Sequence, residues 1–381
     1  MDIKYNDLME SYKNYINISD AIYKLGTFNE NERNKVYNES ELNQIIDSIG
    51  IPPSQFFKMI ENAMKYNNRY FSSYLLLLRK LSKVSDLKKE DILTNYEQEY
   101  DLLFDKSKNT ILKVIMNDDL SSFIFWVEHD EFDEAQKINS NLLFPSQQLD
   151  LIQLCCYYGS VDCFKLLLTK YDTYISQDCL SFSFLGGNPD IMYQCLKVQY
   201  PDEYCMRNAI ASHNIDFITF LMNEYKQRIN LITCAEFNNL HAFFVYLDQN
   251  KQNKEDVDTC FVASSLFNIP SLCEYFLSHH ANINATYYDN TAINWAAQYE
   301  CNKTAEFLIR RGIDIKKTDV IGCTPLHWAT IKKNIEMMKI LIKNGADINA
   351  KSKFQKTPQE IAKENNLDLE SIRRTTGVKH H

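Results

Sequence analysis

The sequence contains few of the residues that interrupt helices. Its 381 residues include only 9 glycines and 8 prolines. Folds rich in tight turns, and phosphate-binding loops built from glycine, need more of both residues. The shortage therefore indicates a helical chain with short connections.

Basic residues and long apolar runs are also scarce. The chain has 41 lysines and arginines against 50 aspartates and glutamates, which gives a net charge of −9. This acidic balance argues against nucleic acid or an anionic membrane as a partner. The longest apolar run, around 74–78, is far shorter than the ~20 residues of a membrane span, and we expect no signal peptide because no apolar run follows the first residues. We expect a soluble cytoplasmic protein, with the nucleus as the other open compartment.

Cysteine pairs of the C-x-x-C kind are absent, although there are 11 cysteines. Most of them lie inside apolar helical runs, such as 154–157 and 272–275. A reduced thiol in such a run acts as a small buried hydrophobic group. A zinc site or a disulfide framework would need regularly spaced pairs. We therefore predict no metal site and no cofactor.

A repeated phrase is the most informative feature that the sequence does contain. Residues 324–329 read Thr-Pro-Leu-His-Trp-Ala, and related phrases stand 33 residues away on either side, at 291–296 and 357–362. Residues 345–350 read Gly-Ala-Asp-Ile-Asn-Ala, with a looser copy at 312–315. Both phrases resemble the signatures of the ankyrin repeat.

That resemblance implies a structural role for each residue of the phrase. Thr324 caps the first helix of the repeat, and Pro325 is tolerated in its first turn. His327 is expected to bond to backbone and to link neighbouring repeats, and Gly345 to end the second helix. The tryptophans of two such phrases, Trp295 and Trp328, are also expected to be structural.

The small residue at Ala329 recurs along the chain at intervals that shorten toward the N-terminus. The spacing is 33 near the C-terminus and 26–28 farther upstream. The shorter units have room for two helices and a tight link, but not for the protruding β-hairpin, or finger, of a 33-residue unit. Such units must stack to bury their apolar faces, which predicts a solenoid. The equivalent positions are Cys155, Ser183, Ala209, Ala235, Ala263, Ala296 and Ala362.

Clipped repeats followed by two or three full ones resemble the expanded ankyrin family of trichomonad protists. The clipped part, which includes Gly-Gly-Asn-Pro at 186–189, is similar to a domain of unknown function (DUF3447). The resemblance covers roughly residues 105–368. It implies an all-α ankyrin-repeat solenoid of stacked helix-turn-helix units with short β-hairpin fingers, preceded by a small helical N-terminal domain. The expected divisions are an N-terminal domain at 1–109, short degenerate repeats at 110–260, regular repeats at 261–368 and a polar tail at 369–381.

The N-terminal domain lacks the repeat motifs but has helical periodicity. Pro52 and Pro53 break the chain before its third helix, and Ser54 is a suitable cap for that helix. Two roles remain open: a cap over the exposed end of the first repeat, which a solenoid needs, or an independent docking domain. The expected helices lie at 8–16, 42–49, 56–64 and 70–81.

Sequence motifs for catalysis are absent. There is no G-x-x-x-x-G-K-[ST] for phosphate, no H-E-x-x-H for zinc and no G-x-S-x-G nucleophile turn. Cys323 and His327 would fall on one helical turn, but both belong to the repeat scaffold and no third group orients them. We therefore predict that the protein is not an enzyme.

The predicted binding surface is the concave face that finger tips and first helices form in ankyrin solenoids. Exposed aromatic rings flanked by polar groups are typical of interface hot spots. Packing between fingers is an equally good role for Tyr287 and Tyr288. Asp289 stands where most fingers have glycine, which predicts a distorted tip. The candidate protein-binding residues are Tyr287, Tyr288, Asn290, Gln298, Tyr299, Arg311, Val320, Ile321, Ile331, Lys332, Lys353 and Phe354.

The predicted function is a non-enzymatic protein–protein interaction module, acting as a monomer that binds a protein partner through this face. The alternative is a substrate-recruiting adaptor, in which the N-terminal domain docks a larger complex and the concave face selects the client. Neither reading identifies the partner, because a variable surface encodes shape and charge and not identity.

Overall fold

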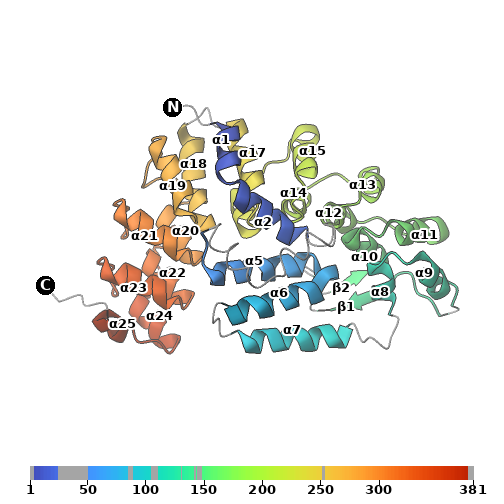
Figure 1. The fold of residues 1–381 in the computed structure, drawn as a ribbon, viewed down its shortest axis with the longest axis horizontal. Coiled ribbons are helices and arrows are strands. Elements are labelled where there is room, and N and C mark those ends of the chain that lie inside the picture. Colours follow the sequence, from blue (N-terminus) through green and yellow to red (C-terminus); the bar gives the residue numbers. More distant parts are fainter. Residues whose placement is uncertain are drawn as a thin grey trace. The chain divides into compact units, whose positions relative to one another are not determined.

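The computed structural model describes residues 4–24, 50–84, 89–103, 110–129, 131–140, 143, 148–250 and 254–375. The predicted helix at 42–49 and the last six residues lie outside this part of the chain. The chain divides into two compact units, residues 11–242 and residues 243–381 with the first ten residues. Both consist of short helices, with one two-stranded hairpin in each among the described residues (Figure 1). The fold is the predicted all-α fold.

The clipped repeats of the 11–242 unit are helix pairs whose first helices pack side by side. Helix α10 contacts α8 and α12, and α14 contacts α12 and α16. The pairs are α8 (Ile111–Met116) with α9 (Leu120–Val127), α10 (Leu151–Tyr158) with α11 (Val161–Tyr171), α12 (Gln177–Gly186) with α13 (Pro189–Leu196), and α14 (Glu203–Ala211) with α15 (Ile215–Tyr225), followed by α16 (Leu231–Glu236).

One hairpin interrupts the series of clipped repeats. Strand β1 (Lys137–Asn139) pairs antiparallel with β2 (Gln148–Asp150), directly before α10. The short repeat spacing predicts no hairpin in this region, and the later connections, after α11 and α13, are indeed short loops. The hairpin occurs because the connection between α9 and α10 is longer than those that follow.

Each pair turns between its two helices at one residue with positive φ. Glycine occupies this place in only two of the nine described pairs, at Gly159 and Gly187. Elsewhere a residue with a side chain adopts the left-handed conformation, which costs more than it does for glycine. The seven others are Asp118, His213, Asn238, Asn268, Glu300, Lys333 and Asn366. A chain with few glycines thus turns repeatedly at strained positions.

The predicted small residue of each repeat is buried, which confirms the register read from the sequence. Ala329 and its equivalents are at most 6% exposed, because the first helices meet at this position. Side-chain caps begin many of the helices, as their sequences predict. The observed capping residues include Asp150, Ser176, Asn188, Asp202, Asn214, Asn230 and Asn334.

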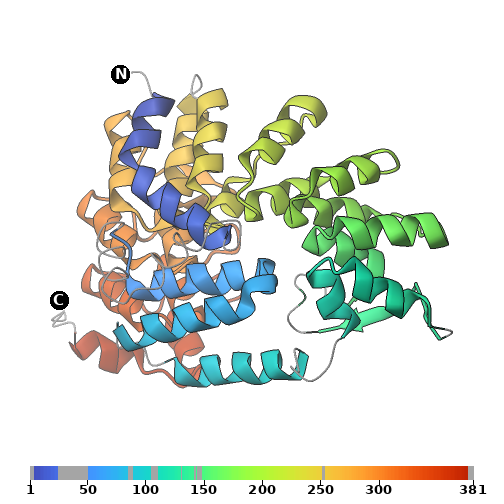
Figure 2. The ribbon, with the colours of Figure 1, turned by 45° about the vertical axis from the view of Figure 1, so that its right-hand side comes forward.

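The N-terminal helices of the 11–242 unit lie side by side in chain order (Figures 1 and 2). They are α2 (Lys13–Tyr23), α5 (Pro53–Tyr66) with the 3-10 turn η1 (Asn68–Tyr70), α6 (Phe71–Val84) and α7 (Glu90–Leu103). Helix α5 begins at Pro53 with Pro52 as its N-cap and no side-chain cap. Ser54 therefore lies in the first turn and not at the predicted cap, because proline is itself suited to the first helical position.

The 243–381 unit contains the regular repeats. Its first helices α18, α20, α22 and α24 pack in that order, as do the second helices α19, α21, α23 and α25. The elements are α18 (Lys254–Ser264), η2 (Ser265–Phe267), α19 (Pro270–Ser278), β3 (Thr286–Tyr287), β4 (Asn290–Thr291), α20 (Ala292–Gln298), α21 (Asn302–Arg310), α22 (Pro325–Ile331), α23 (Ile335–Lys343), α24 (Pro358–Glu364) and α25 (Leu369–Thr375). Helix α1 (Tyr5–Ser11) belongs here up to residue 10, and α17 (Leu240–Asn250) runs across the division between the units.

The C-terminal end of this unit differs from the expected polar tail. Residues 369–375 form helix α25, which contacts α23. Leu369 is fully buried at its start. The polar composition of residues 369–375 did not predict a helix here. The helix forms because one buried apolar side chain is enough to anchor a short helix on its neighbour.

Candidate protein-binding surfaces

The first finger of the regular repeats is an ordered two-residue hairpin. Strands β3 and β4 pair antiparallel, and the two residues between them, Tyr288 and Asp289, both have positive φ (48° and 57°). This combination is the requirement of a type I′ turn, which matches the twist of the strands. Trp295 Nε1 donates a hydrogen bond of 3.0 Å to the carbonyl oxygen of Tyr287. The tip is a regular turn, so the prediction that Asp289 distorts it is wrong.

Asn290 supports this finger from inside. It is 8% exposed, its amide donates to the carbonyl oxygen of Tyr288 at 3.0 Å, and its Oδ1 accepts from Gln298 Nε2 at 3.0 Å. The ring of Tyr299 packs edge-on against Trp295, with 5.9 Å between centroids. Asn290 and Gln298 therefore hold the hairpin against α20, and their side-chain groups are engaged within the finger.

The second finger is built around the carboxylate of Asp319. Its Oδ1 accepts from the backbone amides of Ile321 at 3.0 Å and Cys323 at 2.8 Å, and its Oδ2 accepts from Trp328 Nε1 at 2.8 Å. The third finger is tied to the second by Lys353, whose amide donates to the carbonyl oxygen of Ile321 at 2.9 Å. The charge-assisted bonds to the Asp319 carboxylate fix the second finger without strand pairing, and a backbone bond joins the third finger to it.

His327 links two repeats, as predicted. Its Nδ1 accepts from the Thr324 amide at 3.0 Å, and its Nε2 lies 3.1 Å from the carbonyl oxygen of Lys356 in the next repeat. Burial lowers the pKa of His327, and burial raises the pKa of the nearby Cys323 thiol to about 11. A protonated thiol beside a fully bonded imidazole is a poor nucleophile, which fits a scaffold role for both residues.

Apolar side chains project from this rigid frame. Tyr288, Val320 and Phe354, one from each finger, are 62%, 53% and 73% exposed. Ile331, at the end of α22, is 41% exposed, and Lys332 and Lys353 are exposed beside these groups. We call Tyr288, Val320, Ile331 and Phe354 the finger surface. Tyr287, Gln298, Tyr299 and Ile321 are half-buried beneath it.

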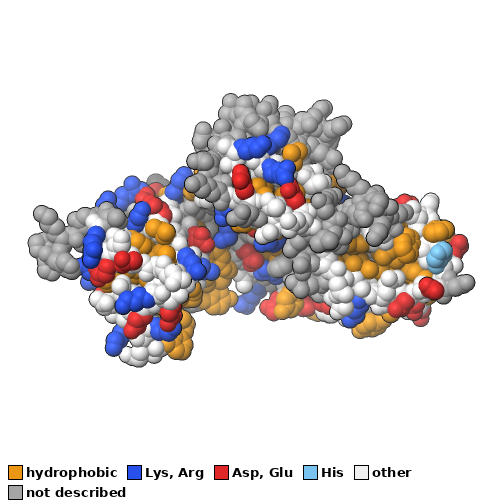
Figure 3. Space-filling view, turned by 90° about the horizontal axis from the view of Figure 1, so that it is seen from below, with side chains coloured by type: hydrophobic (Ala, Val, Ile, Leu, Met, Phe, Trp, Pro, Cys, Tyr) orange, Lys and Arg blue, Asp and Glu red, His pale blue; other side chains and the backbone are white. Residues whose placement is uncertain are grey.

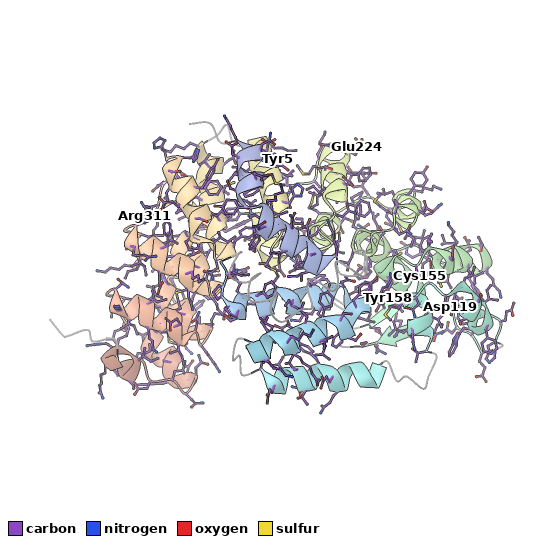
Figure 4. All side chains as sticks on the ribbon, in the orientation of Figure 1. Tyr5, Asp119, Cys155, Tyr158, Glu224 and Arg311 are labelled. Carbon is purple, nitrogen blue, oxygen red and sulfur yellow. The ribbon has the colours of Figure 1, made fainter. Side chains whose placement is uncertain are left out.

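Arg311 does not join the finger surface. It follows α21, a second helix, and pairs with Glu274 of α19 at 2.5 Å. In Figure 4 its label stands on the outer side of α21, away from the first helices α20 and α22. The sequence register placed it among groove residues, whereas the structure pairs it with Glu274 on the neighbouring second helix.

The cysteines and the possible metal ligands of the described residues do not form a reactive or metal-binding cluster. All 11 cysteines are buried, which confirms their prediction as small hydrophobic residues. The described part of the chain contains no group of three or more histidine, cysteine, aspartate or glutamate side chains arranged to hold a metal ion.

The N-terminal helices pack along the clipped repeats. Tyr15 Oη donates to Asn238 Oδ1 at 3.1 Å, and Tyr157 Oη of α10 donates to the carbonyl oxygen of Lys65 at 3.1 Å. Arg207 of α14 donates to Tyr66 Oη at 3.3 Å. These contacts reach α10, α14 and the residues after α16, so α2 and α5 lie along several first helices and not only at the end of the first repeat.

A cleft of about 420 Å³ remains between these N-terminal helices and the clipped repeats. Arg69 forms part of its wall and donates to the carbonyl oxygen of Tyr158 at 2.5 Å, with its guanidinium 5.7 Å from the Tyr158 ring (Tyr158 is labelled in Figure 4). Lys24 and Asp216 also line the cleft. Sequence reasoning missed it, because its walls come from segments far apart in the chain. Its walls carry side chains of both charges together with tyrosines, so they do not indicate one class of ligand.

Comparisons with known proteins agree with the repeat architecture. The model of a Domain of unknown function (DUF3447) matches residues 171–246, that of Ankyrin repeats (3 copies) matches 231–319, and that of the Ankyrin repeat matches 321–353. Among the described residues, none of the helices has the length and apolar character needed to traverse a membrane.

Curated relatives match only in short segments. Palmitoyltransferase AKR1 of Lachancea kluyveri is 43% identical over 67 residues, which are 18% of this chain and 8% of that protein. The protein of the same name from Saccharomyces cerevisiae is 40% identical over 76 residues, 20% of this chain and 10% of its own length. Putative ankyrin repeat protein FPV244 of Fowlpox virus is 42% identical over 45 residues, 12% of this chain and 7% of that protein. The chain thus spans about a tenth of these relatives.

Proposed function

The chain joins a Domain of unknown function (DUF3447) to ankyrin repeats, and from this premise we propose that it is a non-enzymatic module that binds a protein partner through the finger surface. The observation that carries the proposal is the exposure of Tyr288, Val320 and Phe354 on three successive rigid fingers. An exposed ring on a preorganised loop loses little entropy when it is buried, so such a row supplies affinity at low cost.

The bonds beneath the fingers support this proposal. Asp319 fixes one loop through three hydrogen bonds, and the amide of Lys353 fixes the next loop to it. The protruding side chains are therefore already held in one arrangement before a partner binds. The relatives named palmitoyltransferase match over about a quarter of this chain at most, and no catalytic residue is inferred from them.

The test compares proteins captured by the full chain and by a Tyr288→Ala/Phe354→Ala variant, using affinity purification with quantitative mass spectrometry. Both residues are exposed, so circular dichroism and thermal unfolding should match the native chain. We expect a partner to be depleted by about tenfold or more in the variant. Arg311→Ala, on the second-helix side, is the matched control and should retain that partner. Equal capture by all three chains would contradict the proposal.

The adaptor alternative needs a free docking face on the N-terminal domain. Helices α2 and α5 already contact the clipped repeats, so docking would fall to α6 and α7. Leu76 of α6 is 50% exposed, and it offers the change that separates the alternatives. A partner lost with Leu76→Glu but kept with the Tyr288→Ala/Phe354→Ala variant would favour the adaptor.

A further inference from the structure

Helix α9 exposes an apolar face. Phe125 is 65% exposed and Ile124 is 38% exposed, whereas Phe123 and Val127 of the same helix are buried. The structure packs α9 against α8, its partner in the repeat, and against α11. In the part of the chain that the structure describes, the row of second helices α9, α11 and α13 begins at α9, so the row continues from it on one side only. The exposed face of α9 is therefore a place where a further helix can pack.

The segment after α9 is held against this helix by one aromatic ring. Phe132 contacts Phe123 of α9, with 6.5 Å between ring centroids, and Tyr171 of α11, with 5.6 Å. The hydroxyl of Tyr171 donates to the carbonyl oxygen of Val127 at 3.2 Å. The segment that begins at residue 128 thus has a fixed place beside the exposed face.

Carboxylates stand next to the apolar side chains. Glu128, the C-cap residue of α9, follows Ile124 by four positions and Phe125 by three. Residues at these spacings are neighbours on a helix surface. Glu131 and Asp133 are exposed in the segment that follows. Hydrophobic and acidic side chains lie side by side at the right-hand end of Figure 3, the end at which Figure 1 labels α9.

This part of the chain is strongly negative. Residues 114–136 contain seven aspartates and glutamates and no lysine or arginine, in a chain whose net charge is −9. On the neighbouring α11, Lys165 pairs with Asp190 at 3.6 Å, and Lys170 lies over the ring of Tyr171. The local field therefore attracts a basic partner and repels an acidic one.

The apolar face and the charge together select one kind of partner. An exposed phenylalanine ring contributes affinity when apolar side chains of a partner cover it. Carboxylates at the edge of the covered area need cations opposite them, because like charges there are costly. A helix with apolar side chains along one face and lysines or arginines beside them supplies both. Such a helix packs on α9, as α11 does on its other side.

We propose that Ile124, Phe125, Glu128, Glu131 and Asp133, which we call the α9 surface, bind a basic amphipathic helix of a partner protein. The apolar side chains of that helix cover Ile124 and Phe125, and its lysines or arginines pair with the three carboxylates. The α9 surface belongs to the 11–242 unit and the finger surface to the 243–381 unit, so this proposal does not rest on the function proposed for the fingers.

The probe is a fluorescein-labelled peptide of leucine and lysine, placed at helical spacing so that the leucines form one face. Its binding to the full chain is measured by fluorescence anisotropy. We expect the peptide to bind, and the affinity to fall as salt is added, because exposed ion pairs are screened. Two control peptides should bind about tenfold more weakly or less. One has the same composition in scrambled order and no apolar face, and the other has glutamate in place of lysine.

Variants of the full chain locate the site. Phe125→Ala should weaken binding of the probe by about tenfold or more, because it removes the ring that the leucines cover. Glu128→Gln/Glu131→Gln/Asp133→Asn should weaken binding by roughly threefold to tenfold and should reduce its salt dependence. Circular dichroism and thermal unfolding should match the native chain, because all four side chains are exposed.

Two control variants keep the test specific. Glu224→Gln/Glu306→Gln/Glu336→Gln removes the same number of exposed carboxylates from other helices, and it should change the affinity by less than about twofold, since distant charges are screened. Tyr288→Ala/Phe354→Ala removes the finger surface and should leave the affinity unchanged.

Four outcomes would overturn the proposal for the α9 surface. The amphipathic probe does not bind, or it binds no more tightly than the scrambled peptide. Phe125→Ala binds the probe as well as the native chain does. The three-carboxylate variant at 128, 131 and 133 and its control at 224, 306 and 336 weaken binding equally. Binding is lost with the finger variant, which would assign the probe to the fingers.

Discussion

His213 and Asp20 form an ion pair across 193 residues of sequence. His213 Nδ1 lies 2.7 Å from Asp20 Oδ1, and its Nε2 lies 2.8 Å from the carbonyl oxygen of Phe237. Both partners are acceptors, so the imidazole satisfies them when both nitrogens carry protons. The ring is fully buried and stacks on Tyr23 at 4.3 Å. The pair joins α2 to the turn between α14 and α15.

Replacing this aspartate should loosen the N-terminal helices. Asp20→Asn removes the carboxylate that the buried His213 ring contacts, and we expect a loss of about 1–3 kcal/mol in the free energy of unfolding. Urea denaturation of the full chain at pH 7 measures the change. Asp216→Asn, at an exposed carboxylate, is the control and should change stability by less than about 0.5 kcal/mol. Equal values for the two variants would show that the ion pair is not stabilising.

The same pair should make stability sensitive to acid. Burial alone would raise the pKa of Asp20, but its hydrogen bond with His213 and the charges of His213 and Lys24 lower it below the ordinary value of 3.8. A carboxyl with a lowered folded-state pKa contributes stability that is complete above 3.8 and is lost as pH falls through the lower value. Unfolding free energies measured between pH 5 and 2 should fall less steeply in Asp20→Asn than in the native chain.

Gly186 permits close packing of α10 and α12. A Cβ atom there would lie 2.1 Å from the carbonyl oxygen of Cys156 and 2.6 Å from the amide nitrogen of Gly159, both of them backbone atoms. We expect Gly186→Ala to cost about 3 kcal/mol or more, since a backbone must shift. Gly187→Ala meets no atom within 4 Å but has φ of +75°, so it should cost about 1–2 kcal/mol. Thermal and urea unfolding compare them, and a milder effect at 186 than at 187 would be evidence against the close approach.

Lys333 offers a stabilising change. It turns α22 into α23 with φ of 56°, a conformation that glycine adopts without penalty. Relief of that strain exceeds the entropy that glycine adds to the unfolded chain, so Lys333→Gly should stabilise by roughly 0.5 kcal/mol. The neighbouring Lys332 has an ordinary φ of −76°, and Lys332→Gly should destabilise. In paired urea titrations, we expect the two variants to change the free energy of unfolding in opposite directions. A change in the same direction would refute the interpretation.

His327 should give the regular repeats a pH dependence at milder acidity than Asp20. Burial lowers its pKa from 6.5, so the neutral form is favoured in the folded state. Its contribution is present above pH 6.5 and is lost as pH falls through the lowered value, because a proton on Nδ1 would face the Thr324 amide donor. We expect His327→Leu to be less stable at pH 7.5 but to lose less on going to pH 5.5. The exposed His129→Gln serves as control and should follow the native profile.

The sequence alone determined the repeat register and much of the local structure. The small residue of each repeat, from Cys155 to Ala362, is buried as its spacing predicts. His327 bonds to the next repeat, as its motif predicts. These features depend on contacts within one repeat or between adjacent ones, and such contacts recur with a period that the sequence displays directly.

The tertiary structure decided which residues share a surface. Arg311 pairs with Glu274 of a neighbouring second helix, and Asn290 lies inside a finger. Asp20 meets His213 because α2 packs beside the clipped repeats. Such meetings depend on the direction in which side chains leave their helices and on packing between segments far apart in the chain, and neither leaves a periodic signal in the sequence.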